Sequence, residues 1–149
     1  MNISLPSETV FHAIESSIKS YRKFAQQNIS EVFPDITIDQ GLVLLFLNKF
    51  PDMSQTEIAE LVFRDNASMT RMINLMVKNN YLNRSINEQD RRRFNIEITP
   101  KGKDVLKRLP PIIAQNRSQS LQGISEQEQE QLKNILKKIK ANCTKIYAS

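Results

Sequence analysis

The first third of the chain carries apolar patterns that predict two helices. Apolar side chains recur at intervals of three and four across residues 7–33, the spacing of one helix face; they are Phe11, Ile14, Ile18, Tyr21 and Ala25. Pro34 ends this helix because proline has no amide hydrogen to continue it. A second helix is expected to begin at Thr37 and to end before Pro51, and it is apolar on nearly every side. We therefore expect the second helix to be the buried centre of the fold.

Two further helices are predicted in the middle of the chain. Ser54 and Glu57 form a capping-box sequence, in which each side chain bonds the other residue's backbone, and this begins a short third helix. After a turn at Arg64–Asp65, a fourth helix carries one inward apolar stripe, which consists of Met69, Met72, Ile73, Met76 and Val77. We expect Asn80 to end that helix in a left-handed conformation, which asparagine tolerates.

An alternating pattern then predicts a hairpin, because Leu82, Arg84 and Ile86 alternate with polar neighbours, as do Phe94, Ile96 and Ile98. The alternation covers residues 82–86 and 94–98, and residues 87–92 between them are expected to form the hairpin tip. The expected fold is therefore mainly α with one small β-hairpin, an α+β arrangement.

Two helices complete the chain. Thr99 followed by Pro100 is typical of a helix start, and this fifth helix is expected to run to about Leu121. The adjacent Pro110 and Pro111 should kink or interrupt it. A sixth helix, capped by Ser125 and Glu128, carries a long apolar stripe.

The net charge of +5 is unevenly distributed along the chain. Between Arg64 and Arg108, eleven Lys or Arg stand against five Asp or Glu, a net charge of +6, whereas the remainder has ten against eleven, a net charge of −1. All the excess positive charge therefore lies in one segment, which suggests a localised surface for a polyanion. A well-solvated basic surface is the alternative that charge alone leaves open.

The order of short helix, turn, amphipathic helix and hairpin is that of a winged helix-turn-helix. In this fold the fourth helix would present small polar groups and an arginine to the DNA major groove. The hairpin tip, or wing, would reach the adjacent minor groove, whose negative potential suits an inserted arginine. This interpretation explains why Arg91, Arg92 and Arg93 stand together at the tip. A solvated hairpin on an unrelated α+β protein is the alternative.

Several short motifs resemble those of the MarR family of bacterial transcription regulators, and the resemblance covers almost the whole chain. The matching segments are Thr37-Ile38-Asp39-Gln40, Glu57-Ile58-Ala59-Glu60-Leu61, Ser68-Met69-Thr70-Arg71, Asp90-Arg91-Arg92 and Ile98-Thr99-Pro100-Lys101-Gly102. The wing motif is the most specific of these, and the resemblance implies that Asp90 steadies the tip while Arg92 enters the minor groove. Phe63 departs from the family pattern at a position often held by glycine, and Leu75 at one where a basic residue is frequent. Arg64 replaces a frequent aliphatic and is therefore available for a phosphate.

The residues that we predict to bind DNA are polar or charged and lie on the fourth helix, beside it or in the wing. They are Arg64, Asn66, Ser68, Thr70, Arg71, Asn74, Lys78, Arg84, Asp90, Arg91, Arg92 and Arg93. The resemblance implies three functional segments: an N-terminal dimerisation helix in 1–36, a winged helix-turn-helix DNA-binding domain in 37–99, and C-terminal dimerisation helices in 100–149.

The apolar stripes of the terminal helices cannot all be buried on one small winged domain. In the family such helices interleave with those of a second subunit, and a two-fold dimer would present two recognition helices to a pseudo-palindromic operator. The predicted dimerisation residues are Phe11, Ile14, Ile18, Leu132, Ile135, Leu136, Ile139, Cys143 and Ile146. Packing of these stripes within the monomer is the alternative.

The resemblance further implies a repressor that responds to a small molecule bound between the dimerisation helices and the DNA-binding lobe. A pocket of this kind should involve His12, Tyr21, Phe46 and Phe50. Cys143 lies on an apolar stripe, where a buried thiol acts as a small hydrophobic group rather than as a sensor. Neither the operator, the effector nor the sign of regulation can be read from the residues.

Other classes of function find little support. With no Gly-rich phosphate loop, one histidine and one cysteine, the chain offers no catalytic pair and no metal cluster, so we expect no enzyme, no cofactor and no metal. No apolar run has the length of a membrane span, the N-terminus lacks a signal-peptide layout, and a reducing cytoplasm is the simplest setting. Two rival interpretations remain, a winged-helix module that binds an acidic protein and an effector-independent architectural DNA binder.

Overall fold

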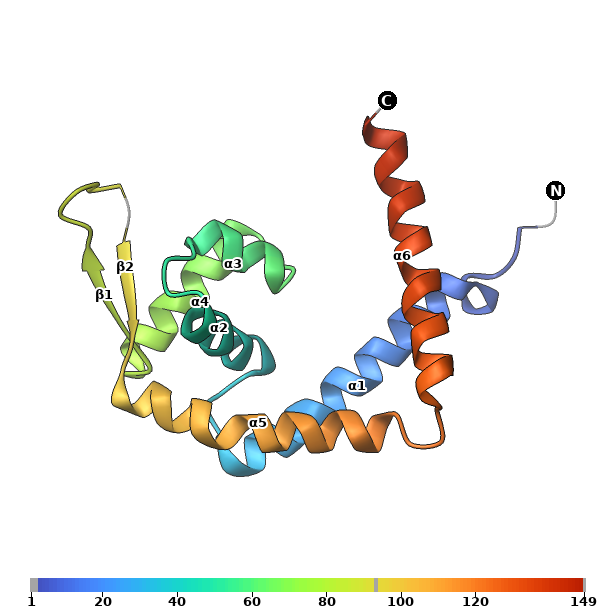
Figure 1. Cartoon of the computed structure of the whole chain (residues 1–149), viewed down its shortest axis with the longest axis horizontal. Helices are drawn as coiled ribbons and strands as arrows, with labels where there is room; N and C mark the ends of the chain where they lie inside the picture. Colours follow the sequence, from blue (N-terminus) through green and yellow to red (C-terminus); the bar gives the residue numbers. More distant parts are fainter. Residues whose placement is uncertain (1–2, 93, 149) are drawn as a thin grey trace. The chain divides into compact units, whose positions relative to one another are not determined.

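The structure, a computed structural model, describes residues 3–92 and 94–148, with the side chains of residues 146–148 excepted. A short 3-10 helix η1 precedes four helices, a hairpin and two more helices (Figure 1). Their bounds are η1 Pro6–Glu8, α1 Val10–Val32, α2 Ile38–Lys49, α3 Gln55–Leu61, α4 Asn66–Lys78, β1 Leu82–Ile86, β2 Phe94–Ile98, α5 Pro100–Ser120 and α6 Glu126–Ala148. The predicted α+β fold with one hairpin is therefore confirmed.

Local capping explains where the central helices begin. The Thr37 hydroxyl accepts a hydrogen bond from the Gln40 amide at 3.2 Å, and the Gln40 side chain accepts one from the Thr37 amide at 3.0 Å. Ser54 and Glu57 repeat this capping box at the start of α3, as predicted. At the start of α4 the carboxylate of Asp65 accepts from the amide of Ser68 at 2.7 Å. Each of these bonds satisfies an amide that the helix itself leaves without a partner.

The core of the winged domain is built around α2, as its all-round apolar sequence predicts. Val43 and Leu44 of α2 are completely buried. The inward stripe of α4 packs into the same cluster, with Met69, Ile73 and Met76 fully buried. Burial of such side chains is the main contribution to the stability of a domain of this size.

The hairpin is joined tightly to the start of α5. The two strands are antiparallel with Leu82 opposite Ile98, and the Thr99 amide extends the pairing to the Tyr81 carbonyl at 3.2 Å. The Thr99 hydroxyl accepts from the Gly102 amide at 3.1 Å and so caps α5. A Cβ at Gly102 would lie 2.5 Å from the Tyr81 carbonyl oxygen, so this close approach requires glycine.

The same region contains a buried tyrosine. The Tyr81 hydroxyl donates to the carboxylate of Asp35 at 2.6 Å, and the ammonium of Lys101 lies 4.2 Å from the Tyr81 ring centre. Burial, together with the hydrogen bond to Asp35, raises the pKa of Tyr81 to about 12. This residue therefore stays protonated beyond the pH at which an exposed tyrosine ionises.

Of the two effects expected for the prolines of α5, a kink or an interruption, the structure excludes the interruption. The helix is not interrupted at Pro110 and Pro111 but continues through both as far as Ser120. Leu109 before the prolines is buried, and Ile112 and Ile113 after them pack against the core. Apolar contacts on both sides therefore hold the helix together although proline removes two of its backbone hydrogen bonds.

By packing, the chain divides into two compact units, Met1–Asn116 and Arg117–Ser149. The first unit includes α1 and most of α5 as well as the winged helix-turn-helix, because Ile29 of α1 and Val105 of α5 belong to its core. The predicted functional boundaries near residues 36 and 99 describe roles rather than packing and stay a prediction. No helix of the described residues is long and apolar enough to cross a membrane.

Candidate nucleic-acid interface

Helix α4 has two opposite faces, as its sequence predicts. Met69, Met72 and Met76 face the core, whereas Arg71 and Lys78 are exposed to solvent. Neither Arg71 nor Lys78 has a hydrogen bond or an ion pair to another side chain of the described residues. These two cations are therefore available to an external anion.

Other predicted contact residues on α4 have partners inside the protein. The Thr70 hydroxyl accepts from the amide side chain of Gln55 at 2.7 Å and donates to the Asn66 carbonyl at 2.9 Å, which fastens α3 to α4. The Asn74 side chain accepts a hydrogen bond from Arg84 at 2.6 Å. Asn66 itself is exposed at the first position of α4.

Arg84 joins the wing to α4. Besides its bond to Asn74, its guanidinium lies over the ring of Phe94, 3.8 Å from the centroid. Arg84 and Phe94 are diagonal neighbours in the strand register, where Arg84 pairs with Ile96 and Ile86 with Phe94. Such diagonal pairs on one face of a hairpin contact each other, so the register is the signal from which this contact could have been predicted. The side chain holds the wing beside the exposed face of α4.

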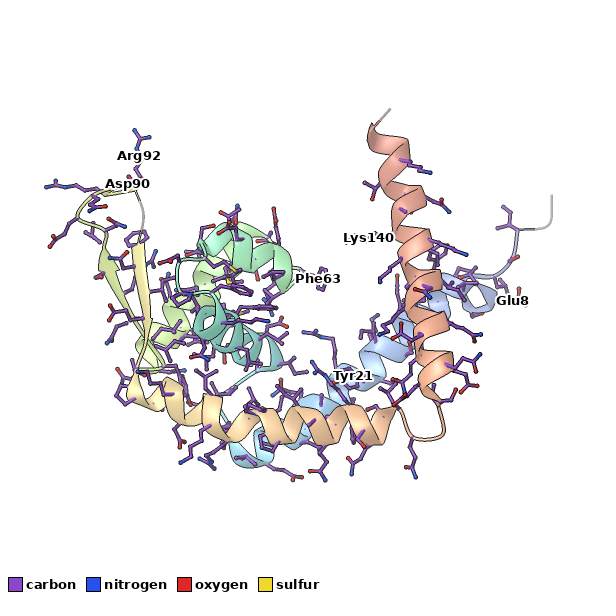
Figure 2. All side chains as sticks on the ribbon, viewed as in Figure 1. Glu8, Tyr21, Phe63, Asp90, Arg92 and Lys140 are labelled. Atoms are coloured by element: carbon purple, nitrogen blue, oxygen red, sulfur yellow. The ribbon has the colours of Figure 1, made fainter. Side chains whose placement is uncertain are left out.

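The wing tip is shaped by short polar side chains. The side-chain oxygen Oδ1 of Asn87 accepts from the backbone amides of Gln89 at 2.9 Å and Asp90 at 3.3 Å. The Asp90 carboxylate then accepts from the amide of Arg92 at 3.1 Å. Arg91 and Arg92 are exposed, and Figure 2 shows Arg92 projecting beyond the tip. Arg93 lies outside the described residues.

The turn between α3 and α4 contains a network that sequence reasoning missed. Arg64 donates from Nε to Asp39 at 2.7 Å and from Nη1 to the hydroxyl of Ser68 at 2.6 Å. Asp39 is buried, and its second oxygen accepts from Arg22 of α1 at 2.6 Å. Arg22, Asp39 and Arg64 are far apart in sequence, so no local pattern signals their contact. Arg64, predicted to be available for a phosphate, is thus bonded within the protein.

Phe63 in the same turn has an unusual backbone conformation. Its φ of 58° lies in the left-handed region, where a side chain is unfavourable. The ring is 93% exposed and stands clear of α3 (Figure 2). The chain thus has a left-handed residue where the family often has glycine.

The predicted dimerisation residues lie on exposed or half-buried surfaces within each unit. Phe11 and Ile18 of α1 are exposed, and Ile14 is half-buried. On α6, Leu132, Ile135, Leu136 and Cys143 are exposed, and Ile139 is half-buried. The side chain of Ile146 lies outside the described residues.

The four residues predicted to form an effector pocket have different environments. His12 is exposed on α1, Tyr21 is half-buried, Phe46 packs against the core, and Phe50 is 44% exposed at the end of α2. A shallow depression on α1 is lined by Gln26, Gln27, Asn28, Ser30 and Glu31 and includes none of them. An effector pocket stays a prediction.

A helix-turn-helix made of α3 and α4, followed by a two-stranded wing beside α4, places the protein among the winged helix-turn-helix proteins. The model of the MarR family matches residues 36–94, the segment that contains these elements. Over residues 36–94 the chain therefore matches the MarR family, whose members are winged-helix transcriptional regulators and not enzymes.

Solved structures share the fold over nearly the whole chain. BpsR of Bordetella bronchiseptica, described with a mechanism by which 6-hydroxynicotinic acid regulates its DNA binding, is 22% identical; the match covers 93% of this chain and 98% of that one, with a TM-score of 0.82. MepR of S. aureus, solved as a DNA complex, is 24% identical over 90% and 98%, with a TM-score of 0.80. A mutant of MarR from E. coli is 20% identical over 93% and 98%, with a TM-score of 0.68. At these identities the likeness concerns the fold.

Proposed function

We propose that this protein is a homodimeric repressor that binds a pseudo-palindromic DNA operator and responds to a small molecule. The observation that carries the proposal is that one domain has two sets of exposed cationic side chains, one on α4 and one on the wing tip. Arg71 and Lys78 are exposed on the outer face of α4, and Arg91 and Arg92 are exposed on an ordered wing tip. The Arg84–Asn74 bond joins the two elements.

This arrangement matches the two grooves of DNA. The exposed face of α4 fits the major groove, where arginine recognises guanine edges and short polar side chains can bond other bases. The tip would lie over the adjacent minor groove, where the negative potential favours arginine. Other polar residues of the predicted set, such as Thr70 and Asn74, contribute by fixing the helix and the wing.

The homodimer follows from the exposed apolar residues of α1 and α6. Exposed apolar stripes such as that of α1 and that of α6 are uncommon on a monomer in water, and a two-fold dimer would carry two α4 helices one helical turn of DNA apart. DNA as the target places the protein in the cytoplasm.

Regulation by a small molecule is supported by analogy. The fold is shared with BpsR, whose DNA binding is regulated by 6-hydroxynicotinic acid, and with MepR, which was solved with DNA. A ligand near Tyr21, Phe46 and Phe50 would act by changing the spacing of the two α4 helices. The chemistry of that ligand is left open.

The experiment starts by selecting bound sites from random DNA with the purified full chain. Binding to the selected duplex is then titrated at several salt concentrations, because phosphate contacts make affinity fall steeply with salt. Arg92→Ala should weaken binding by about 1–3 kcal/mol and leave the dimer folded. Arg117→Ala, an exposed arginine of α5, loses the same charge outside the interface and should change little.

Each outcome has a distinct meaning. Equal affinity of wild type and Arg92→Ala removes the wing from the interface. Failure to enrich any sequence, with salt-dependent binding to all DNA, supports the architectural alternative. Absence of DNA binding at low salt supports a protein-binding module and contradicts the proposal.

A further inference from the structure

Asp39 holds two arginines that come from different elements. It lies in the first turn of α2, and its side chain is 6% exposed. One oxygen accepts from Nη2 of Arg22 on α1 at 2.6 Å, and the other accepts from Nε of Arg64 at 2.7 Å. Both carboxylate oxygens are therefore used in charge-assisted hydrogen bonds, which are shorter and stronger than neutral ones.

Arg64 continues the connection to the DNA-reading helix. Its Nη1 donates to the hydroxyl of Ser68 at 2.6 Å, while the Ser68 amide donates to Asp65 at 2.7 Å. Ser68 is thus held at its side chain and its backbone in the first turn of α4. The bonds link α1, α2, the turn and α4 within the compact unit Met1–Asn116.

The network also changes the electrostatic role of Arg64. Its side chain is 36% exposed, yet two of its three nitrogens are bonded inside the protein. The charge on Asp39 offsets one of the two guanidinium charges beside it. Arg64 is therefore not a free cation in the way that Arg71 and Lys78 are.

We propose that Asp39 is a positioning residue for DNA recognition, which keeps Arg64 against Ser68 and, through Arg22, ties the first turn of α4 to α1. The inference rests on the proposed function, because it needs α4 to read DNA. It goes further by assigning a role to buried Asp39 and by giving Arg64 a role within the protein instead of at a phosphate. A displacement of α1 against α2 acts through this network on Ser68.

A phosphate contact of Arg64 and its retention by Asp39 predict different salt dependences for the variant Arg64→Gln. If Arg64 binds a phosphate in the wild type, Arg64→Gln must reduce the slope of log K against log salt by about 0.9 on duplex DNA. If Asp39 keeps Arg64 on the protein, Arg64→Gln leaves that slope unchanged. In both cases Asp39 stays paired with Arg22, so this variant does not leave a buried charge alone.

Asp39→Asn tests the network from the other side. Loss of the carboxylate charge releases Arg64, which then reaches a phosphate, so the slope on a random duplex should become steeper by about 0.9. Ser68 loses its support at the same time, and the ratio of affinities for the selected and the random duplex should fall by about tenfold. Arg64→Gln should lower that ratio to a similar degree without the change in slope.

Asp104→Asn is the matched control. Asp104 is exposed on α5 and paired with Arg108 at 3.0 Å, so its substitution makes the same change in net charge without touching the network of Asp39. It should leave both the slope and the affinity ratio unchanged. Equal effects of Asp104→Asn and Asp39→Asn would show that charge alone is responsible and would overturn the inference.

A double variant tests the link to α1. Arg22→Gln should lower the affinity ratio, and Arg22→Gln combined with Asp39→Asn should be no worse than Asp39→Asn alone, because groups in one network are not additive. Additive losses would overturn the link. If Asp39→Asn does not fold, as judged by its melting curve, Arg64→Gln decides the question.

The inference and the proposed function fail in different ways. A wild type that does not bind DNA contradicts the proposed function. A wild type that binds, with Asp39→Asn and Arg64→Gln keeping its affinity ratio, contradicts only the positioning role of Asp39.

Discussion

The two compact units use the same kind of sequence pattern with opposite results. In Met1–Asn116 the apolar stripe of α4 is buried, with Met69 and Ile73 completely inaccessible. In Arg117–Ser149 the stripe of α6 has the same spacing, yet Leu132 and Ile135 are more than half exposed, and no residue from 117 to 145 is buried. The difference teaches that amphipathic spacing identifies a helix face that needs a partner but not where the partner comes from. For α6 we infer that the partner is a second copy of this chain.

Of the changes considered, removal of α6 should have the largest effect, because it takes away the exposed stripe of the second unit. Ending the chain after Gly123 removes the stripe and exposes the surface that it would cover in the proposed dimer, so aggregated or unfolded protein is expected. Light scattering on the full chain should give twice the 17.2 kDa of one chain at micromolar concentration. The interface should belong to the large apolar class, roughly 2,000 Å² or more.

Two results would contradict the dimer. One is a full-length monomer at micromolar concentration. The other is a truncated chain that stays soluble and binds the selected duplex as tightly as the full chain, since a lone winged domain has one recognition helix for two half-sites.

Charged substitutions should separate the buried stripe of α4 from the exposed face of the same helix. Met72→Asp places an unpaired charge in the core, at a site 7% exposed, and should destabilise the winged domain by about 3–5 kcal/mol. Leu75→Asp on the same helix, at a site 47% exposed, should cost far less. Chemical unfolding followed by circular dichroism measures both, and a normal midpoint for Met72→Asp would mean that the facing of α4 is wrong.

A pH titration should detect the buried tyrosine of the first unit. The pKa of Tyr81 is raised to about 12 in the folded protein, whereas the unfolded value is about 10. Because the raised pKa favours the protonated native state, this stabilisation is complete below pH 10 and is lost as the pH rises through 12. The unfolding free energy of the wild type should therefore fall more between pH 10 and 12 than that of Tyr81→Phe.

The loss of unfolding free energy caused by Tyr81→Phe at neutral pH provides a second test of the contact between Tyr81 and Asp35. Tyr81→Phe should cost about 1 kcal/mol at pH 7 through the lost hydrogen bond to Asp35. Tyr21→Phe removes the hydroxyl of a half-buried tyrosine on α1, serves as the control at pH 7, and should cost less than Tyr81→Phe. Parallel curves for wild type and Tyr81→Phe up to pH 12 would be evidence against the raised pKa.

The smallest expected change in stability concerns Phe63, in the exposed turn between α3 and α4. Phe63→Gly relieves the left-handed strain without loss of buried surface, so stability should rise by about 0.5–1 kcal/mol. Phe63→Ala keeps the Cβ and the strain, and it should leave the urea midpoint almost unchanged. A glycine variant less stable than the alanine variant would contradict the strain, and an alanine variant clearly less stable than the wild type would show that the ring makes a stabilising contact.

Local chemistry made most of the elements predictable. Thr37, Ser54 and Ser125 each have a capping partner three residues later, and all three helix starts are confirmed. Asn80 has a φ of 64°, the left-handed end predicted for α4. The interactions that decide these features lie within a few residues of one another.

Contacts between distant residues could not be predicted in this way. Asp39 is 17 residues from Arg22 and 25 from Arg64, so only the folded chain brings them together. Arg64 and Arg84 were predicted at the DNA surface from their charge and their place beside the fourth helix and in the wing, and both have partners inside the protein. The prolines of α5 were misleading for a related reason, because core contacts on both sides outweigh a local preference.

The hydrogen bonds at the wing tip have a kinetic and entropic consequence. Asn87 and Asp90 together accept three backbone amide bonds within the tip, so the loop has its shape before any encounter. A binding segment that is ordered in advance loses little backbone freedom on association, and the remaining entropy loss falls on the arginine side chains. An encounter with DNA then needs no slow folding step in the wing, and the association rate should be set by diffusion and charge.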